Sequence, residues 1–366
     1  MRIAYIINSV EGGGAAFPVP AVTRVLRDAG AHVEVFGLTR RDERALPQMF
    51  ADGLRVHLRE GGNRDHRAAY RWLERKLAAY RPTLIWTSLT RATVIGLLLG
   101  WRHAIPVVCW QHNASLERGN LLLLQILRER PVMWIADSDA VCTVTAKRFS
   151  VPPERMACWP LFAADPSAPQ ARPWRPGQTL CLGSLGRLQP AKGYDVLMDA
   201  LALLNQRGFV APVPFEIAIA GDGDEREVII RAARRAGFPG LRMVGFSERP
   251  LDFLAGLHLY LQPSRREGLC IGMHEAMQAG LPVIASAVGQ MPFTLEAGRS
   301  GWLVPPGDVN ALSDALAAAL ANPGQLAAMG QAARARVLPL FSAAAFRKAG
   351  ETVLERLRAR GVRDAV

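Results

Sequence analysis

The sequence predicts an α/β protein made of two domains, each built on a parallel β-sheet. The chain has 366 residues, which exceeds one ordinary domain and suffices for two that each bury a core. Half of the residues are hydrophobic and 21% are charged, a composition typical of globular proteins rather than disordered or fibrous ones. Strand-like and helix-like segments alternate along the chain, and a proline-rich break near the middle divides the pattern in two.

The first half contains short apolar segments typical of strands, separated by amphipathic segments typical of helices. Strands that alternate with helices form crossover units and hence a parallel sheet. We therefore predict a Rossmann-like domain over residues 1–165. Its expected strands are residues 3–7, 33–37, 84–86, 107–110 and 133–136.

Four prolines then interrupt the pattern, and residues 166–178 are predicted to be a linker. A second Rossmann-like domain follows over residues 179–340, and residues 341–366 are expected to form a helix, with packing back on the first domain as one option. A ligand of such sheets binds at the carboxyl ends of the strands, here in the expected cleft between the domains. The strands expected in the second domain are residues 180–185, 215–220, 241–244, 258–261 and 282–285.

Several classes of protein are disfavoured by the composition. No apolar stretch approaches the roughly 18 residues of a membrane span, and the apolar run after Met1 stops at Asn8, so it predicts a strand rather than a signal peptide. The cysteines are odd in number and lack C-x-x-C spacing, which favours neither disulfides nor zinc and suggests a reducing cytoplasm. They are Cys109, Cys142, Cys158, Cys181 and Cys270.

The formal net charge of +12 attracts anions in general, including nucleotide phosphates, acidic lipids and nucleic acid. We find no recognition helix and no aromatic RNA-binding motif, so nucleic acid is not an expected partner.

The segment after the strand at 258–261 predicts a phosphate site. A strand that enters a helix through a glycine-containing turn leaves free N–H groups at the positive end of the helix dipole, here those of Leu269, Cys270 and Ile271. Glu267 precedes this helix and Glu275 follows eight residues later, about 12 Å along a helical axis. This spacing suits a nucleotide sugar laid lengthwise, although two surface glutamates would give the same pattern.

A second loop carries two cations. Arg187 and Lys192 follow the strand at 180–185, where they are expected to hold a diphosphate and neutralise its charge as it leaves. Solvated surface charges are the alternative for each.

In the first domain, Gly12, Gly13 and Gly14 follow the first strand, and His112 follows the strand at 107–110. The glycines allow a phosphate to approach the backbone or simply form a flexible turn. A lone histidine is more often a packing residue than a catalytic one.

Asp137, Ser138 and Asp139 imitate a D-x-D metal motif. Because a strand ends there and a helix begins, we predict that Ser138 or Asp139 caps the helix. No metal is expected in the protein, since Arg187, Lys192 and the helix dipole can supply the positive charge.

Together these segments resemble the retaining glycosyltransferases of family 4, which have the GT-B fold. The resemblance covers nearly the whole chain. Its pieces are the glycine loop at 12–14, His112, G-R-L-x-x-x-K-G at 186–193, I-A-G-D-G at 219–223, E-x7-E at 267–275 and G-W-L-V-P-P-G-D at 301–308. The chain departs from the family at Cys270, where glycine is frequent, and at Phe293, where a G-G-x-P-E stretch has glutamate.

The resemblance implies a role for each matching position. The first domain would bind the acceptor and the second the nucleotide sugar, with no further cofactor. The implied contacts are Arg187 and Lys192 with the diphosphate, Glu267 with the sugar hydroxyls, Glu275 with the ribose, Gly13 and Gly14 with the phosphate region, His112 with the transferred sugar, and Gly245 and Phe246 with the base.

The predicted function is transfer of a sugar from a UDP- or GDP-linked donor to a glycan or lipid-linked acceptor in cell-surface polysaccharide or lipopolysaccharide synthesis. A dinucleotide-dependent oxidoreductase is disfavoured because neither glycine loop fits its fingerprint. A nucleotide-sugar epimerase, a phosphorylase and a non-catalytic nucleotide-sugar-binding protein remain alternatives.

Contact with an anionic membrane surface at the inner face of the cell membrane is a further hypothesis. Basic side chains with interfacial aromatics suit such a surface, whereas packing of the apolar residues into the core is the alternative. The residues concerned are Arg64, Arg67, Tyr70, Arg71, Trp72, Leu73, Arg75 and Lys76, and residues 121–124 with Arg118, Arg128 and Arg130.

Overall fold

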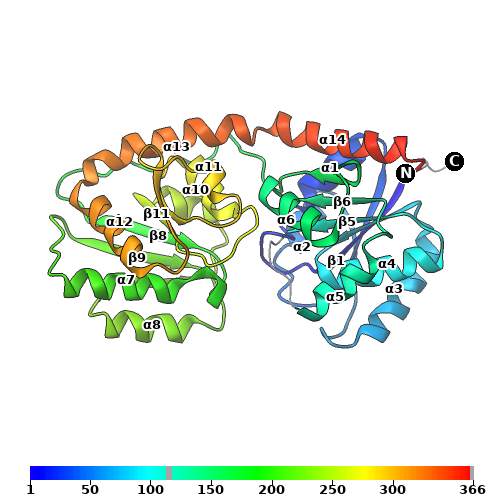
Figure 1. Ribbon diagram of the computed structural model, residues 1–366, viewed down its shortest axis with the longest axis horizontal. Coiled ribbons are helices and arrows are strands. Elements are labelled where there is room, and N and C mark those ends of the chain that lie inside the picture. Colours follow the sequence, from blue (N-terminus) through cyan, green and yellow to red (C-terminus); the bar gives the residue numbers. More distant parts are fainter. Residues whose placement is uncertain (113–117, 363–366) are drawn as a thin grey trace. The chain divides into compact units, whose positions relative to one another are not determined.

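The computed structural model describes residues 1–112 and 118–362. They form two compact units, the first comprising residues 1–162 and those from 344 onward, the second residues 163–343 (Figure 1). Each unit is described by itself.

The first unit is built on a parallel seven-stranded sheet with the order β3-β2-β1-β4-β5-β6-β7. The strands are β1 (Arg2–Ser9), β2 (His32–Thr39), β3 (Arg55–Leu58), β4 (Leu84–Ser88), β5 (Val107–Gln111), β6 (Met133–Ala136) and β7 (Met156–Cys158). The helices are α1 (Val19–Asp28), α2 (Leu46–Ala51), α3 (His66–Tyr80), α4 (Thr90–Arg102), α5 (Arg118–Leu127), α6 (Asp139–Phe149), the 3-10 turn η1 (Pro153–Arg155) and α14 (Ala343–Ala359). Right-handed crossovers place α3, α4, α5 and α6 on one face of the sheet, each beside the next, and α1 and α2 on the other.

Three tryptophans fill the centre of this unit and receive the C-terminal helix. The ring of Trp159 stacks on Trp110 at 5.0 Å and meets Trp86 edge-on at 6.0 Å. On α14, the ring of Phe346 lies 5.5 Å from that of Trp159, and a Cβ at Gly350 would collide with the same indole. The glycine therefore lets α14 pack closely on the first unit.

The second unit has a parallel six-stranded sheet with the order β10-β9-β8-β11-β12-β13. The strands are β8 (Leu180–Leu185), β9 (Phe215–Ala220), β10 (Leu241–Gly245), β11 (Leu259–Gln262), β12 (Val283–Ser286) and β13 (Gly301–Val304). The helices are η2 (Pro190–Lys192), α7 (Tyr194–Gln206), α8 (Arg226–Arg235), α9 (Pro250–Ala255), α10 (Ile271–Gln278), α11 (Met291–Thr294), α12 (Val309–Ala321), η3 (Pro323–Gln325) and α13 (Leu326–Leu340).

In both sheets the strand order reverses beside the first strand, between β1 and β4 and between β8 and β11. In each sheet, the connections that leave the two strands at the reversal run in opposite directions, so a crevice opens at the carboxyl ends of these strands. The predicted class, two Rossmann-like parallel sheets with helices, is confirmed.

The proline-rich segment groups with the second unit. Ala171 N donates to the carbonyl of Ala279 at 2.7 Å, and Trp174 packs against the core of that unit. The segment is thus bound to the second unit along part of its length.

Candidate functional site

The site of the second unit begins at the strand reversal, where a tyrosine joins the two central strands. Tyr260, on β11, is fully buried, and its hydroxyl lies 3.1 Å from the carbonyl oxygen and 3.3 Å from the amide nitrogen of Leu185, on β8. The ends of β8 and β11, and the loops that leave them, are therefore held at fixed positions.

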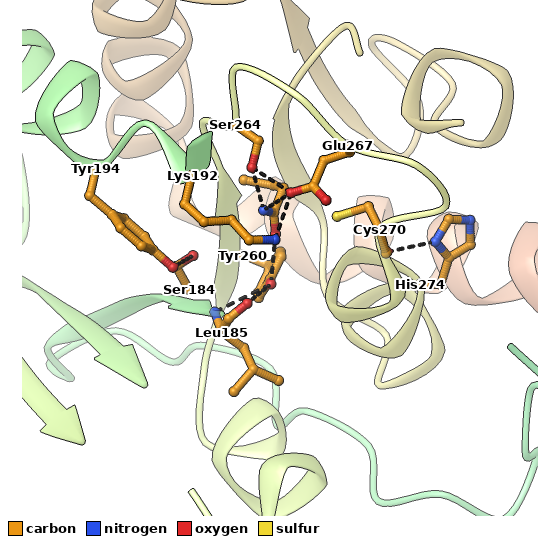
Figure 2. A network of polar contacts seen from close by, with 10 residues as sticks. Ser184, Leu185, Lys192, Tyr194, Tyr260, Ser264, Glu267, Cys270 and His274 are labelled. Carbon is orange, nitrogen blue, oxygen red and sulfur yellow. Dashed lines mark hydrogen bonds and ion pairs between the residues drawn. The ribbon is translucent and has the colours of Figure 1, made fainter. Parts of the chain in front are cut away.

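Lys192, from the loop after β8, contacts Glu267, from the loop after β11. Lys192 Nζ donates to Glu267 Oε1 at 2.7 Å, and their side chains are 23% and 11% exposed (Figure 2). Ser264 Oγ donates to the same oxygen at 2.7 Å and Gln262 Nε2 at 3.1 Å. Oε1 thus accepts three hydrogen bonds, whereas the described residues give Oε2 none, and Oε2 remains available for a ligand hydroxyl.

The backbone around Lys192 is fixed by close approach. Gly193 has φ +66°, and a Cβ there would collide with the carbonyl oxygen of Pro263, so only glycine lets the two loops touch. Arg265 donates to both carboxylate oxygens of Asp195, at 2.6 and 2.7 Å, and ties the loops together a second time.

The charge of Lys192 is stabilised by its partner. Burial alone would lower the pKa of this ammonium group, but the neighbouring groups, Glu267 foremost, together outweigh burial and hold the pKa above its usual value. Lys192 is therefore a permanent cation at the carboxyl end of β8.

The phosphate site predicted at Leu269, Cys270 and Ile271 lies at the start of α10. Cys270 is the residue before the helix and has φ +65° and ψ +67°, a left-handed conformation that strains a residue with a side chain. Among the described residues no hydrogen bond uses the N–H groups of these three residues. These three N–H groups at the N-terminus of α10 are therefore available to bind an anion.

A buried histidine that the sequence reasoning missed holds this strained residue. His274 Nδ1 lies 2.9 Å from the carbonyl oxygen of Cys270, and Nε2 lies 3.1 Å from Thr294 Oγ1. Burial lowers the pKa of His274 to about 4, so the imidazole is neutral at pH 7, with Nδ1 donating to the carbonyl and Nε2 accepting from threonine. The sequence signal that could have identified His274 is its position four residues after Cys270, one helical turn away.

Glu275 lies in the second turn of α10, and burial raises the pKa of its carboxyl group to about 7. The sequence-based span of about 12 Å from Glu267 counted eight helical steps. That estimate is wrong in its premise, because residues 268–270 are not helical and only the steps from Ile271 to Glu275 follow the helix.

The other residues predicted for the second unit lie on neighbouring loops. Arg187 is exposed in the loop after β8. Gly245 ends β10 with φ +81°, its carbonyl accepts from Gly221 N at 2.7 Å, and Phe246 beside it is half-buried. Their predicted contacts with diphosphate and base stay predictions.

In the first unit, His112 follows β5. Its Nε2 lies 2.7 Å from Ser88 Oγ at the end of β4, and its Nδ1 lies 3.8 Å from an oxygen of Asp137, which follows β6. Burial lowers the pKa of His112 to about 3, so it is neutral. Three strand ends thus bring polar groups together around this imidazole.

The glycine loop forms a tight turn. The carbonyl of Gly13 accepts from the N–H groups of Ala16 and Phe17, each at 3.1 Å, and Gly14 is exposed. Neither Gly13 nor Gly14 has a positive φ, so the backbone conformation does not itself require glycine at these two positions.

The D-x-D sequence caps a helix, as predicted: Ser138 Oγ accepts from Val141 N at 3.2 Å at the start of α6. Within residues 1–112 and 118–362, no three His, Cys, Asp or Glu side chains cluster as metal ligands would.

Comparisons with known proteins agree with this architecture. Residues 12–162 match the family described as Glycosyltransferase Family 4, and residues 171–336 match Glycosyl transferases group 1. The chain belongs to glycosyltransferase family 4. The fold is GT-B, since the structure of Anabaena Alr3699/HepE in complex with UDP-glucose superposes with a TM-score of 0.83 over 97% of this chain and 100% of that one, at 20% identity.

Relatives of this glycosyltransferase family differ in the length they share with the chain. The amylovoran biosynthesis glycosyltransferase AmsK of Erwinia amylovora is 33% identical over 49% of this chain, and the chain spans 46% of that protein's length. The D-inositol 3-phosphate glycosyltransferase of Thermobispora bispora is 27% identical over 87% of this chain and 84% of its own length.

Proposed function

We propose that the protein is a retaining glycosyltransferase that moves a sugar from a UDP- or GDP-linked donor to a glycan or lipid-linked acceptor. The observation that carries the proposal is the Lys192–Glu267 pair at 2.7 Å, set at the carboxyl ends of β8 and β11. It supplies a cation for a diphosphate and a carboxylate oxygen for sugar hydroxyls within one site.

The start of α10 supports the same donor. A diphosphate carries negative charge, and the open N–H groups before α10 lie at the positive end of the helix dipole. One turn later, Glu275 offers a carboxyl group to the ribose hydroxyls. The proposed sugar, phosphate and ribose contacts thus follow one another along residues 267–275, in the order in which these groups are linked in a nucleotide sugar.

In the proposed reaction, the acceptor oxygen attacks C1 of the sugar from the face that the diphosphate leaves. The bond from C1 to the phosphate oxygen breaks, the bond from C1 to the acceptor oxygen forms, and the acceptor proton passes to the departing phosphate oxygen. Lys192, together with Arg187, stabilises the charge that develops on that oxygen. Fixed cations of this kind contribute about 10² to 10³ in rate.

The donor and acceptor classes rest on the relatives. HepE is described in complex with UDP-glucose, and a Mycolicibacterium smegmatis relative, 35% identical over 47% of this chain, is described as a GDP-mannose-dependent phosphatidylinositol monomannoside mannosyltransferase. Two other relatives are named as an amylovoran biosynthesis glycosyltransferase and as a putative colanic acid biosynthesis glycosyltransferase. We therefore propose cell-surface polysaccharide synthesis as the process.

A panel of nucleotide sugars tests the proposal. The protein is incubated with UDP-glucose, UDP-galactose, UDP-N-acetylglucosamine and GDP-mannose, with and without glycan acceptors, and the products are separated chromatographically. Transfer or slow donor hydrolysis that depends on Lys192 supports a glycosyltransferase. A changed sugar still bound to nucleotide would identify an epimerase, and binding without turnover a non-catalytic protein.

A further inference from the structure

Two neighbouring helices of the first unit expose an unusual amount of apolar surface. Ten large apolar side chains are exposed in the described residues, and five of them lie on α4 and α5. Single exposed apolar residues are common, but a contiguous group marks an interaction surface. We name this group the α4–α5 face: Leu98 (37% exposed), Trp101 (65%), Leu122 (60%), Leu123 (46%) and Ile126 (70%).

The core of the first unit does not use these side chains. On α4, Leu97 and Leu99 face inward and are buried, and on α5, Leu124 and Leu127 do the same. Helix α5 is therefore apolar on the side that faces the core and on the side that faces away. Among the described residues, the apolar side chains on the outer side are not part of this core.

Basic groups border the face. The guanidinium group of Arg130 lies over the ring of Trp101, 4.3 Å from its centroid. Tyr70, on α3, lines a shallow depression together with Leu98, Trp101 and Arg102. An indole and a phenol next to guanidinium groups suit the boundary between lipid headgroups and acyl chains.

The charge around the face is mostly positive. Arg67, Arg71 and Arg75 are exposed on α3, the helix beside α4. Nearby carboxylates are matched by bases: Glu74 pairs with Arg102 at 2.9 Å, and Glu129 pairs with Arg155 at 2.9 Å. The unmatched charge therefore comes from arginine and complements an anionic surface.

We infer that the α4–α5 face lies on an anionic lipid bilayer, with Trp101 and Ile126 at the level of the headgroups and the arginines against lipid phosphates. No helix within the described residues has the length and apolarity to cross a membrane, and the inferred contact is with the surface. This narrows the sequence-based hypothesis, because part of the apolar set follows the alternative of core packing: Leu73 and Leu124 are fully buried, and Tyr70, Trp72 and Leu121 pack partly against the core.

Vesicle co-sedimentation tests the inference. The protein is mixed with phosphatidylcholine vesicles that contain or lack phosphatidylglycerol, at low and at raised salt. Wild-type protein should bind only the anionic vesicles, and binding should weaken with salt. Trp101→Ser combined with Ile126→Ser should lower the partition coefficient at least about ten-fold. Replacement of Arg67, Arg71 and Arg75 by Ser should lower it about five-fold for each charge removed.

Phe50→Ser is the matched control, because Phe50 is 58% exposed on α2, on the opposite face of the sheet; its binding should equal wild type. Thermal melting shows that each variant is folded, and UDP binding reports the donor site separately, so a failed donor proposal leaves this test intact. Equal binding to neutral vesicles, or wild-type binding by the Trp101 and Ile126 variant, overturns the inference. A dimer seen by light scattering and abolished in that variant would overturn it in favour of self-association.

Discussion

Lys192 Nζ lies 2.7 Å from Oε1 of Glu267, and this ion pair links the loop after β8 to the loop after β11. The two residues for which the sequence predicts diphosphate binding and sugar binding separately thus form one coupled pair. A donor that contacts Lys192 must compete with, or share, the carboxylate.

Lys192→Ala should lower kcat by about 10² to 10³, because a fixed cation is lost where charge develops. Arg187→Ala should act in the same direction. Steady-state kinetics with the donor found in the panel measure both. Arg242→Ala, at an exposed position on β10, is the control and should retain wild-type kcat.

Activity should also survive EDTA, and loss of turnover with the chelator would count against cation catalysis by these side chains.

Donor binding should depend on pH through Glu275. The folded pKa of about 7 lies above the ordinary value of 4.5, so the folded protein binds this proton more tightly than the unfolded chain. Ionisation of this buried carboxyl group therefore lowers the free energy of unfolding progressively as pH rises from about 4.5 to above 7, by roughly 3 kcal/mol in all.

Since the ionised carboxylate is the better acceptor for ribose hydroxyls, donor Kd should fall over the same rise in pH. Calorimetric titration with the free nucleotide between pH 5.5 and 8.5 measures this. Glu275→Gln should flatten both profiles, and Glu275→Ala should mainly raise donor KM. An unchanged pH profile in the Gln variant would refute the assignment.

Cys270→Gly should be tolerated despite the burial of Cys270. Relief of the left-handed strain at φ +65° offsets the lost side-chain packing, so the free energy of unfolding should change by less than about 1 kcal/mol. Cys109→Gly, at another buried cysteine in β5, has no such relief and should cost more than about 2 kcal/mol. Urea unfolding of both variants compares them, and equal losses would show that the conformation of Cys270 carries no strain.

His112→Ala should reduce kcat without removing a titration near pH 6.5. Burial lowers the pKa of His112 to about 3, so the wild-type imidazole is neutral from pH 5 upward and contributes no limb to the pH–rate profile. Because His112 Nε2 contacts Ser88 Oγ, the Ser88→Ala variant should be measured alongside His112→Ala. A wild-type acidic limb near pH 6.5 that disappears in His112→Ala would contradict this account.

The sequence predicted the central strands well because these are buried apolar runs with little competition from other structures. It missed β3, β7 and β13, which lie at the edges of their sheets, where short or polar segments such as Arg55–Leu58 carry a weak apolar signal. The motif residues Lys192 and Glu267 were found, but their direct contact was not, because it depends on the spatial approach of two loops. Gln262, Ser264 and His274 were missed for the same reason, since each acts through a partner that sequence spacing does not reveal.

The stereochemistry of transfer tests the central claim most directly. The anomeric proton of the first-formed product is observed by NMR with an α-linked nucleotide-sugar donor, in parallel with Lys192→Ala and Glu267→Gln enzyme. The account predicts an α-linked product from the wild type and at least about 10²-fold slower formation of the same product by the Lys192 variant. A β-linked product, or a wild-type rate in the Lys192 variant, would contradict it.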